Sequence, residues 1–146
     1  MIPFLVMLSS LILFWCLGLL GLPWWTSWQD CVPYALAVLF LFTAGSRLTP
    51  MREDLAKMVP SGISYPQLLV SATGILEALG AIGLLIPSTR RAAALGLALM
   101  LIAIFPANVN GARNHIQLRG KQATPLWLRL PMQLVYIGLA IWSAFL

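Results

Sequence analysis

The stretch TGILEALGAIGLL, residues 73–85, carries one charged side chain, Glu77, among apolar and small residues. The apolar run that contains it extends over residues 65–86, long enough for a helix that crosses a bilayer, which needs about 20 residues. On such a helix Glu77 lies about 12 residues from the start, which places it roughly 18 Å deep at 1.5 Å per residue. The stretch therefore predicts a transmembrane helix with a carboxyl group near the middle of the membrane.

The rest of the chain shares this apolar character. Of the 146 residues, 60% are hydrophobic and 9% are charged, and the mean hydropathy is +0.90, whereas soluble domains carry about 25% charged residues. The sequence predicts an all-α fold, a polytopic membrane helical bundle that forms a single transmembrane domain over residues 1–146. Its expected membrane-spanning helices cover residues 3–22, 32–48, 65–86, 92–112 and 126–146.

Two segments at the edges of these helices need a separate interpretation. The first apolar run lacks a basic segment before it and a small-residue cleavage site after it, so it is interpreted as a retained helix and not as a signal peptide. The segment MREDLAKM, residues 51–58, mixes both signs of charge. It fits a short interfacial helix and equally a solvated turn.

The basic residues predict an orientation in the membrane. With five spans, one side carries the N-terminus and seven of the nine Lys and Arg residues, and the other side carries only Arg90 and Arg91. Cytoplasmic segments are enriched in Lys and Arg. We therefore expect an integral protein of the bacterial cytoplasmic (inner) membrane, with its N-terminus inside and its C-terminus outside.

Composition also narrows the partners and cofactors. The net charge is +5, but the basic residues are scattered singly between apolar runs, so no nucleic-acid partner is expected and the lipid bilayer is the expected neighbour. Cys16, Cys31 and the single histidine, His115, show no metal-ligand spacing. No metal site and no covalently bound cofactor are predicted, His115 is interpreted as a loop residue, and the spacing does not say whether the two thiols meet.

A carboxyl group inside a membrane must be neutral, paired or next to water. Burial favours the neutral form, so Glu77 is interpreted as a neutral, hydrogen-bonded acid that could handle a proton or a polar ligand. The alternative is a purely structural hydrogen bond between helices. The five-span topology places a set of other polar side chains in the same half of the membrane, which predicts a polar cleft with Glu77 at its base. The candidate ligand-binding residues at its mouth are Arg47, Asn108, Arg129 and Gln133.

Three stretches together resemble the DoxX family of small membrane proteins. They are FLFTAGSRL at residues 40–48, the run from GILEALG to FPAN at residues 74–108, and LRLPMQ at residues 128–133. The resemblance implies a four-helix membrane bundle, to which residues 3–22 would add one N-terminal helix. Arg47 stands where that family often has Lys.

The resemblance also implies a function. DoxX relatives are associated with redox partners in bacterial membranes, so the favoured hypothesis is a redox-associated accessory subunit that binds a quinone or a similar lipophilic ligand. Glu77 would donate a proton or a hydrogen bond to a quinone carbonyl. The chain lacks haem, iron–sulfur, flavin and nicotinamide motifs, so electrons would come from an oxidoreductase partner and the chain is not expected to be a complete enzyme alone.

Two further hypotheses remain open. A buried acid and a proline-interrupted helix are common in transporters, so the chain could carry a small molecule or an ion, as an oligomer because one copy is small. Small residues on helix faces permit close helix association, so the chain could instead be a non-catalytic assembly or chaperone module. In that case Glu77 would only link helices.

Overall fold

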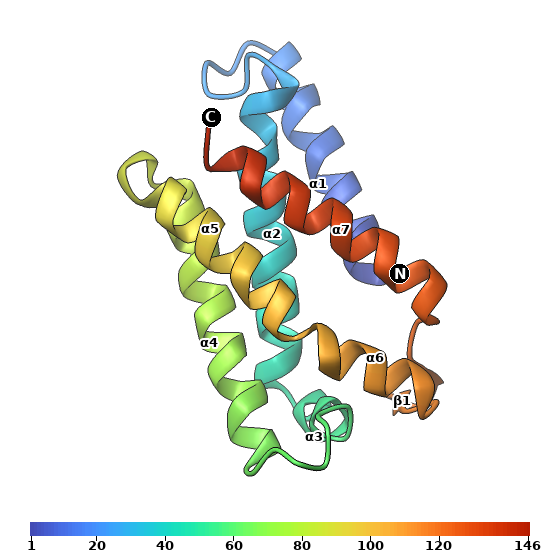
Figure 1. The fold of residues 1–146 in the computed structure, drawn as a ribbon. Helices are drawn as coiled ribbons and strands as arrows, with labels where there is room; N and C mark the ends of the chain where they lie inside the picture. The colour runs from blue at the N-terminus through green and yellow to red at the C-terminus, as the bar shows by residue number, and fades with distance from the viewer.

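The computed structural model describes residues 1–146 and consists of helices joined by short connections (Figure 1). One short antiparallel hairpin, which pairs Gln117 with Gln122 and Leu118 with Lys121, interrupts the helices. The elements in chain order are α1 (Ile2–Leu19), α2 (Trp28–Leu48), α3 (Met51–Ala56), α4 (Pro66–Leu85), α5 (Pro87–Ala103), α6 (Phe105–Arg113), β1 (Gln117–Leu118), β2 (Lys121–Gln122) and α7 (Leu126–Ser143).

The predicted fold class, an all-α polytopic bundle, is confirmed. Five helical segments are long and apolar enough to cross a membrane, with α5 and α6 counted as one segment. Many of their large apolar side chains point outward, for example Leu68, Leu79, Leu99 and Leu134, each at least 60% exposed. Water-soluble proteins rarely expose apolar surface on this scale, so the surface agrees with an integral membrane protein.

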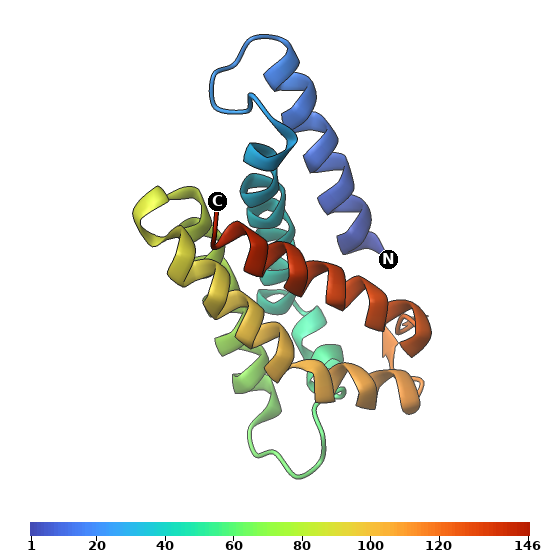
Figure 2. The same ribbon diagram turned by 45° about the horizontal axis from the view of Figure 1, so that its top comes forward.

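Helix α2 lies at the centre of the bundle and packs against α1, α4 and α7 (Figures 1 and 2). It begins at a capping box, because Asp30 N–H bonds the Ser27 hydroxyl and Ser27 N–H bonds the Asp30 carboxylate. This cap starts the helix four residues before the predicted start at residue 32. Helix α1 buries only Met7 and Ser10 and packs mainly on α2, so it is a peripheral addition to the bundle.

The α4–α5 connection is one residue, Ile86, and its chemistry explains the sequence around it. Pro87 stands in the first turn of α5, where a missing N–H is harmless. Thr89 Oγ1 donates to the Gly83 carbonyl at 3.0 Å and Arg90 Nε donates to the Leu84 carbonyl at 2.9 Å. These bonds satisfy carbonyls that the end of α4 leaves free. Helix α5 therefore begins at Pro87, before the predicted start at residue 92.

Close packing at this hairpin yields a first prediction. A Cβ added at Gly83 would lie 2.7 Å from the Ala93 Cβ on α5, so Gly83→Ala should force α4 and α5 apart. Overpacking of this kind lowers the free energy of unfolding by about 1–3 kcal/mol. Denaturant titration in detergent measures the change, and Gly96→Ala is the matched control because a Cβ there meets nothing within 4 Å. Equal stability of the two variants would contradict the packing.

Long-range hydrogen bonds hold the basic segments together at one end of the bundle, drawn at the bottom and lower right in Figure 1. Asn110 Nδ2 donates to the Met58 carbonyl at 2.8 Å, joining α6 to the segment after α3. The Arg119 N–H of the hairpin donates to Asp54 at 3.1 Å, and the Met1 ammonium donates to Thr124 Oγ1 at 3.3 Å. The opposite end carries the α1–α2 connection, the α4–α5 connection and the C-terminus.

Candidate functional site

The first polar group inside the bundle is an ion pair between α2 and α4. Arg47 Nε lies 2.9 Å from Glu77 Oε2, and the two side chains are 16% and 2% exposed. Arg47 Nη1 also donates to Thr73 Oγ1 at 3.4 Å. Gly74 makes this approach possible, because a Cβ there would lie 2.9 Å from the Arg47 Cβ. Thr73 and Gly74 each lie next to Glu77 on α4, because they precede it by four and three residues.

The ion pair changes the interpretation of Glu77. The sequence favoured a neutral acid, whereas the structure shows the pairing with a cation that an intramembrane acid can also adopt. A paired carboxylate accepts hydrogen bonds and has no proton to donate. The hydrogen bonds available to a ligand in this arrangement must therefore come from other residues.

The second polar group links α6 and α7. Arg129 Nη1 donates to Asn108 Oδ1 at 3.1 Å, and Asn108 Nδ2 donates to Gln133 Oε1 at 3.0 Å. Gln133 Nε2 in turn donates to the main-chain carbonyl of Leu101 near the end of α5. The three side chains therefore form one chain of hydrogen bonds across three helices, and each amide is held by both its oxygen and its nitrogen.

A break between α5 and α6 explains the position of Gln133. Helix α5 ends at Ala103, α6 begins at Phe105, and Pro106 in its first turn has no N–H. No main-chain N–H of α6 bonds the Leu101 carbonyl. Gln133 takes that place, as interior backbone groups in a membrane require a partner. The sequence predicted one span over residues 92–112 whose helix is interrupted by this proline; in the structure Pro87–Arg113 forms one span, and the interruption falls at Ile104, between α5 and α6.

Arg129 differs from the other polar side chains of this region because most of its hydrogen-bond donors have no partner in the protein. The ion pairs of the structure are Arg47–Glu77 and Lys57–Asp54, so no carboxylate pairs with Arg129. A guanidinium has five N–H donors, and the Asn108 oxygen is the one protein acceptor that Arg129 bonds. The half-buried Arg129 side chain therefore offers unused donors and an unbalanced positive charge.

Tyr136 adds a second unused donor on the same face of α7. It lies seven residues beyond Arg129 and three beyond Gln133, spacings that place all three on one helix face. Its side chain is buried, and its hydroxyl has no hydrogen-bond partner. Its ring lies 6.3 Å from that of Phe4 on α1. An unpartnered buried hydroxyl is uncommon in proteins and marks a place where a ligand oxygen could bind.

The orphan hydroxyl yields a second prediction. Tyr136→Phe removes a buried polar atom without a partner and keeps the ring, so it should leave the free energy of unfolding unchanged or raise it by about 1 kcal/mol. Chemical denaturation in detergent measures this. Ser143→Ala is the contrasting control, because the Ser143 hydroxyl bonds the Leu139 carbonyl at 2.8 Å. A clear loss of stability in Tyr136→Phe would show that the hydroxyl has a partner.

The predicted cleft residues thus form two groups. Arg47 forms an ion pair with Glu77. Hydrogen bonds join the other three residues at the α6–α7 junction: Arg129 bonds Asn108, and Asn108 bonds Gln133. Sequence reasoning missed the Asn110 bond to the Met58 carbonyl, because no local pattern relates two residues that lie 52 positions apart. No three potential metal ligands lie together, and the cysteines are free, with Cys16 exposed and Cys31 buried.

Outside the membrane-spanning helices, Asp54 and Lys57 form an exposed ion pair at 2.9 Å. The Lys57 hydrogen bond lowers the pKa of the Asp54 carboxyl, and the Arg119 N–H lowers it further. Asp54 in turn raises the pKa of Lys57. Exposed pairs of this kind contribute little to stability. In this pair, however, the Asp54 carboxylate also accepts the hydrogen bond from the Arg119 N–H of the hairpin.

Fold and site together define a membrane-spanning helical bundle with an interior polar network and an uncompensated arginine. Residues 36–144 match the model of a family described as "Domain of unknown function (DUF8561)", and the chain belongs to that family. No curated protein and no solved structure matches the chain. Helix α1 and the first part of α2 lie outside the matched region.

This match corrects the resemblance to the DoxX family, which was wrong. The model that matches residues 36–144 is that of a different, uncharacterised family. The redox association and the four-helix core of the DoxX family therefore do not carry over to this chain by membership. The membrane bundle itself rests on the helices of the structure and is unaffected.

Proposed function

We propose that this chain is an accessory membrane protein that binds the oxygen-bearing head of a lipophilic molecule at the α6–α7 junction, with a quinone as one candidate. The single observation that carries the proposal is Arg129, a guanidinium in the polar interior with one neutral protein acceptor and no carboxylate. A partly buried charge without a counter-ion costs free energy unless it finds further hydrogen-bond acceptors, and a bound ligand oxygen would supply them.

The surroundings of Arg129 suit an acceptor-rich head group. Asn108 and Gln133 fix the guanidinium in place through their chain of hydrogen bonds, so its unused donors have a defined direction. A residue held by its neighbours binds with a smaller loss of side-chain entropy. The Tyr136 hydroxyl offers a further donor about two helical turns along α7, so a ligand with two separated oxygens fits better than a small ion.

The Arg47–Glu77 ion pair gives Glu77 a structural role. Because Glu77 is bound to Arg47, the proposal assigns Glu77 to holding α2 against α4 and gives proton donation to no residue of this chain. The oxidoreductase partner expected earlier came from the DoxX resemblance, so the proposal is limited to binding. Whether the bound molecule is reduced depends on partners outside this chain.

The distribution of Lys and Arg residues supports a location and an orientation in the membrane. Seven of the nine Lys and Arg residues lie at the end that holds the N-terminus, α3 and the hairpin, and such ends face the cytoplasm. We therefore place the protein in the bacterial inner membrane with the site in the cytoplasmic half. Labelling of single cysteines in a variant without Cys16 and Cys31 tests this. Labelling of a C-terminal cysteine only from the cytoplasm would contradict it.

The α5–α6 break favours a second candidate, transport. Discontinuous helices line substrate sites in many transporters. Here the break leaves the Leu101 carbonyl without a main-chain partner, and the Gln133 side chain donates a hydrogen bond to it. Flux of a candidate substrate in proteoliposomes, absent in Arg129→Gln, would favour transport over binding alone.

The test of the proposal starts from the tagged full chain purified from its native membranes in mild detergent. Organic extraction and mass spectrometry then quantify every lipophilic molecule per protein. We expect one class of oxygen-headed molecule other than phospholipid, quinones included, near one per chain and enriched over its share of the membrane. Extracts with only bulk phospholipids in membrane proportions would overturn the proposal.

A further inference from the structure

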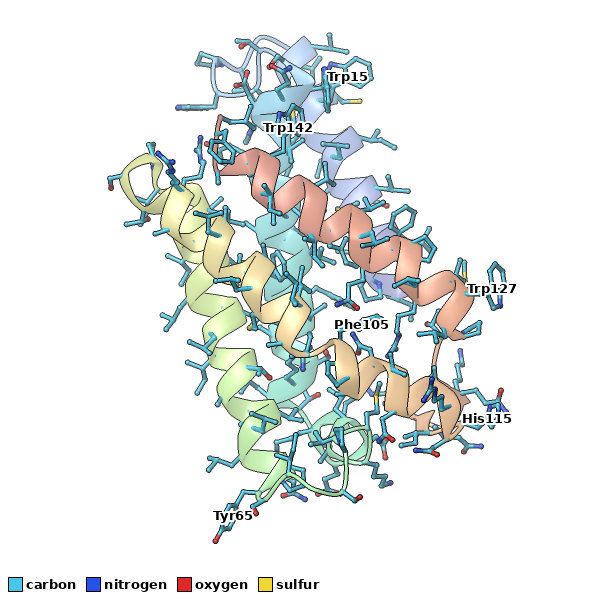
Figure 3. All side chains as sticks on the ribbon, in the orientation of Figure 1. Trp15, Tyr65, Phe105, His115, Trp127 and Trp142 are labelled. Carbon is cyan, nitrogen blue, oxygen red and sulfur yellow. The ribbon has the colours of Figure 1, made fainter.

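A pocket separate from the Arg129 hydrogen bonds lies where α6, the hairpin and the start of α7 meet. Its volume is about 480 Å³. Figure 3 labels His115 and Trp127 at this corner of the molecule. The polar and charged side chains that line it are Arg113, His115, Gln122 and Thr124.

The pocket is electropositive. No Asp or Glu lines it, and the exposed Arg113 forms no ion pair. The nearest acid fixed to the hairpin, Asp54, is already bonded by Lys57 and by the Arg119 N–H. The Met1 ammonium also borders the pocket, and its pKa is lowered by burial and by the positive charge of Arg129. An anion placed here therefore meets cationic groups without a competing carboxylate.

The position of the pocket along the membrane normal follows from α7. Leu126, the first residue of α7, lines the pocket, and the next residue, Trp127, is 76% exposed. Exposed Trp at the end of a membrane-spanning helix is favoured at the level of the lipid head groups. The pocket therefore opens where the phosphates of a leaflet lie, at the end of the bundle that carries most of the basic residues.

We propose that this pocket binds the phosphate of an anionic phospholipid. Arg113 supplies positive charge, and His115, Gln122 and Thr124 supply hydrogen-bond donors for phosphate and head-group oxygens. Leu126 and Ala123 give the glycerol end an apolar wall. Basic pockets beside membrane-spanning helices bind anionic head groups in this manner. The inference is independent of the Arg129 site, which bonds Asn108 and does not line the pocket.

The test uses the purified full chain in non-ionic detergent with dioctanoyl phosphatidylglycerol as the probe. Native mass spectrometry counts bound lipid, and titration gives the affinity. We expect phosphatidylglycerol to bind about tenfold more tightly than dioctanoyl phosphatidylcholine, and the double variant Arg113→Gln/His115→Gln to lose about that factor. Arg119→Gln, which removes an exposed charge of the same hairpin that does not line the pocket, should keep the wild-type affinity.

Three results would overturn the inference. One is equal binding of the two lipids, and another is an equal loss of affinity in Arg119→Gln and in the double variant, which would indicate a diffuse surface charge. The third is displacement of the lipid by millimolar inorganic phosphate or glycerol phosphate as effectively as by unlabelled lipid, which would indicate a site for free phosphate. If the double variant does not fold, the single variants Arg113→Gln and His115→Gln are compared with Arg119→Gln by the same titration.

Discussion

Arg47→Ala is expected to lower the free energy of unfolding by about 3–5 kcal/mol, the usual cost of removing one partner of a buried ion pair. Glu77 is 2% exposed and Arg47 Nε lies 2.9 Å from its carboxylate, so the variant leaves a buried carboxyl group without its cation. Glu77 must then take up a proton or draw water into the bundle, and both weaken the contact between α2 and α4.

A double-mutant cycle separates this effect from lost packing. The variants are Arg47→Met, Glu77→Met and the pair together, each unfolded by denaturant in detergent. We expect the double variant to be more stable than the sum of the single losses predicts, with a coupling of about 1–3 kcal/mol. Arg52→Met is the control, because Arg52 is exposed and bonds only Ser71, at 3.3 Å. Additive losses would show that the ion pair does not form.

Arg129→Gln is expected to weaken binding of a short-chain quinone by about tenfold to a hundredfold, the effect of losing one or more hydrogen bonds from a charged donor. Unlike Arg47→Ala, this change should leave the free energy of unfolding unchanged or higher. The reason is that Arg129 forms no ion pair, so its removal leaves no carboxylate without a cation. The Gln side chain also removes a charge that no counter-ion balances.

Equilibrium binding of short-chain benzoquinone and naphthoquinone analogues in detergent measures the affinity, and denaturant titration of the same samples measures stability. Arg52→Gln is the control, since it removes a charge from the same end of the bundle without touching α6 or α7. Stability that falls in parallel with binding would mean that Arg129 is structural, and the proposed site would then lose its basis.

Hydropathy was sufficient to predict the membrane-spanning helices, because the length of an apolar run and its outward-facing surface are properties of single segments. The differences lie where side chains bond the backbone. Ser27 and Asp30 extend α2 through a capping box, and Thr89 and Arg90 bond carbonyls of α4 at the start of α5, which begins before the predicted residue 92. The segment at residues 51–58 contains a helix, α3, as one of its two interpretations predicted.

The polar network was predictable in composition but not in pairing. The five-span topology placed Arg47, Glu77, Asn108, Arg129 and Gln133 in one half of the membrane. Which arginine meets the acid depends on how α2 and α7 rotate against α4, and this is set by packing between segments far apart in sequence. The close approach of Arg47 to Gly74 goes with the observed pairing, and it joins residues 27 positions apart, which a local sequence pattern does not predict.

The mistaken family resemblance has a physical origin. Its most specific part was the order of an acid, an LLIP exit, a basic pair and the motif PAN. In the structure the LLIP exit and the basic pair form a tight hairpin, with Pro87 in the first turn of α5 and Arg90 bonding the Leu84 carbonyl. Helix ends in general leave carbonyls that need partners, so this part of the pattern reflects a local requirement and is weak evidence for a family.

Photo-crosslinking with a diazirine-bearing short-chain quinone, followed by peptide mapping of the labelled full chain, tests the central claim most directly. The account predicts label on peptides of α6 and of the first half of α7, around Asn108 and Gln133, and displacement of that label by unlabelled quinone. Label confined to the lipid-facing surfaces of α4 and α5, or label that excess quinone does not displace, would contradict a binding site at the α6–α7 junction.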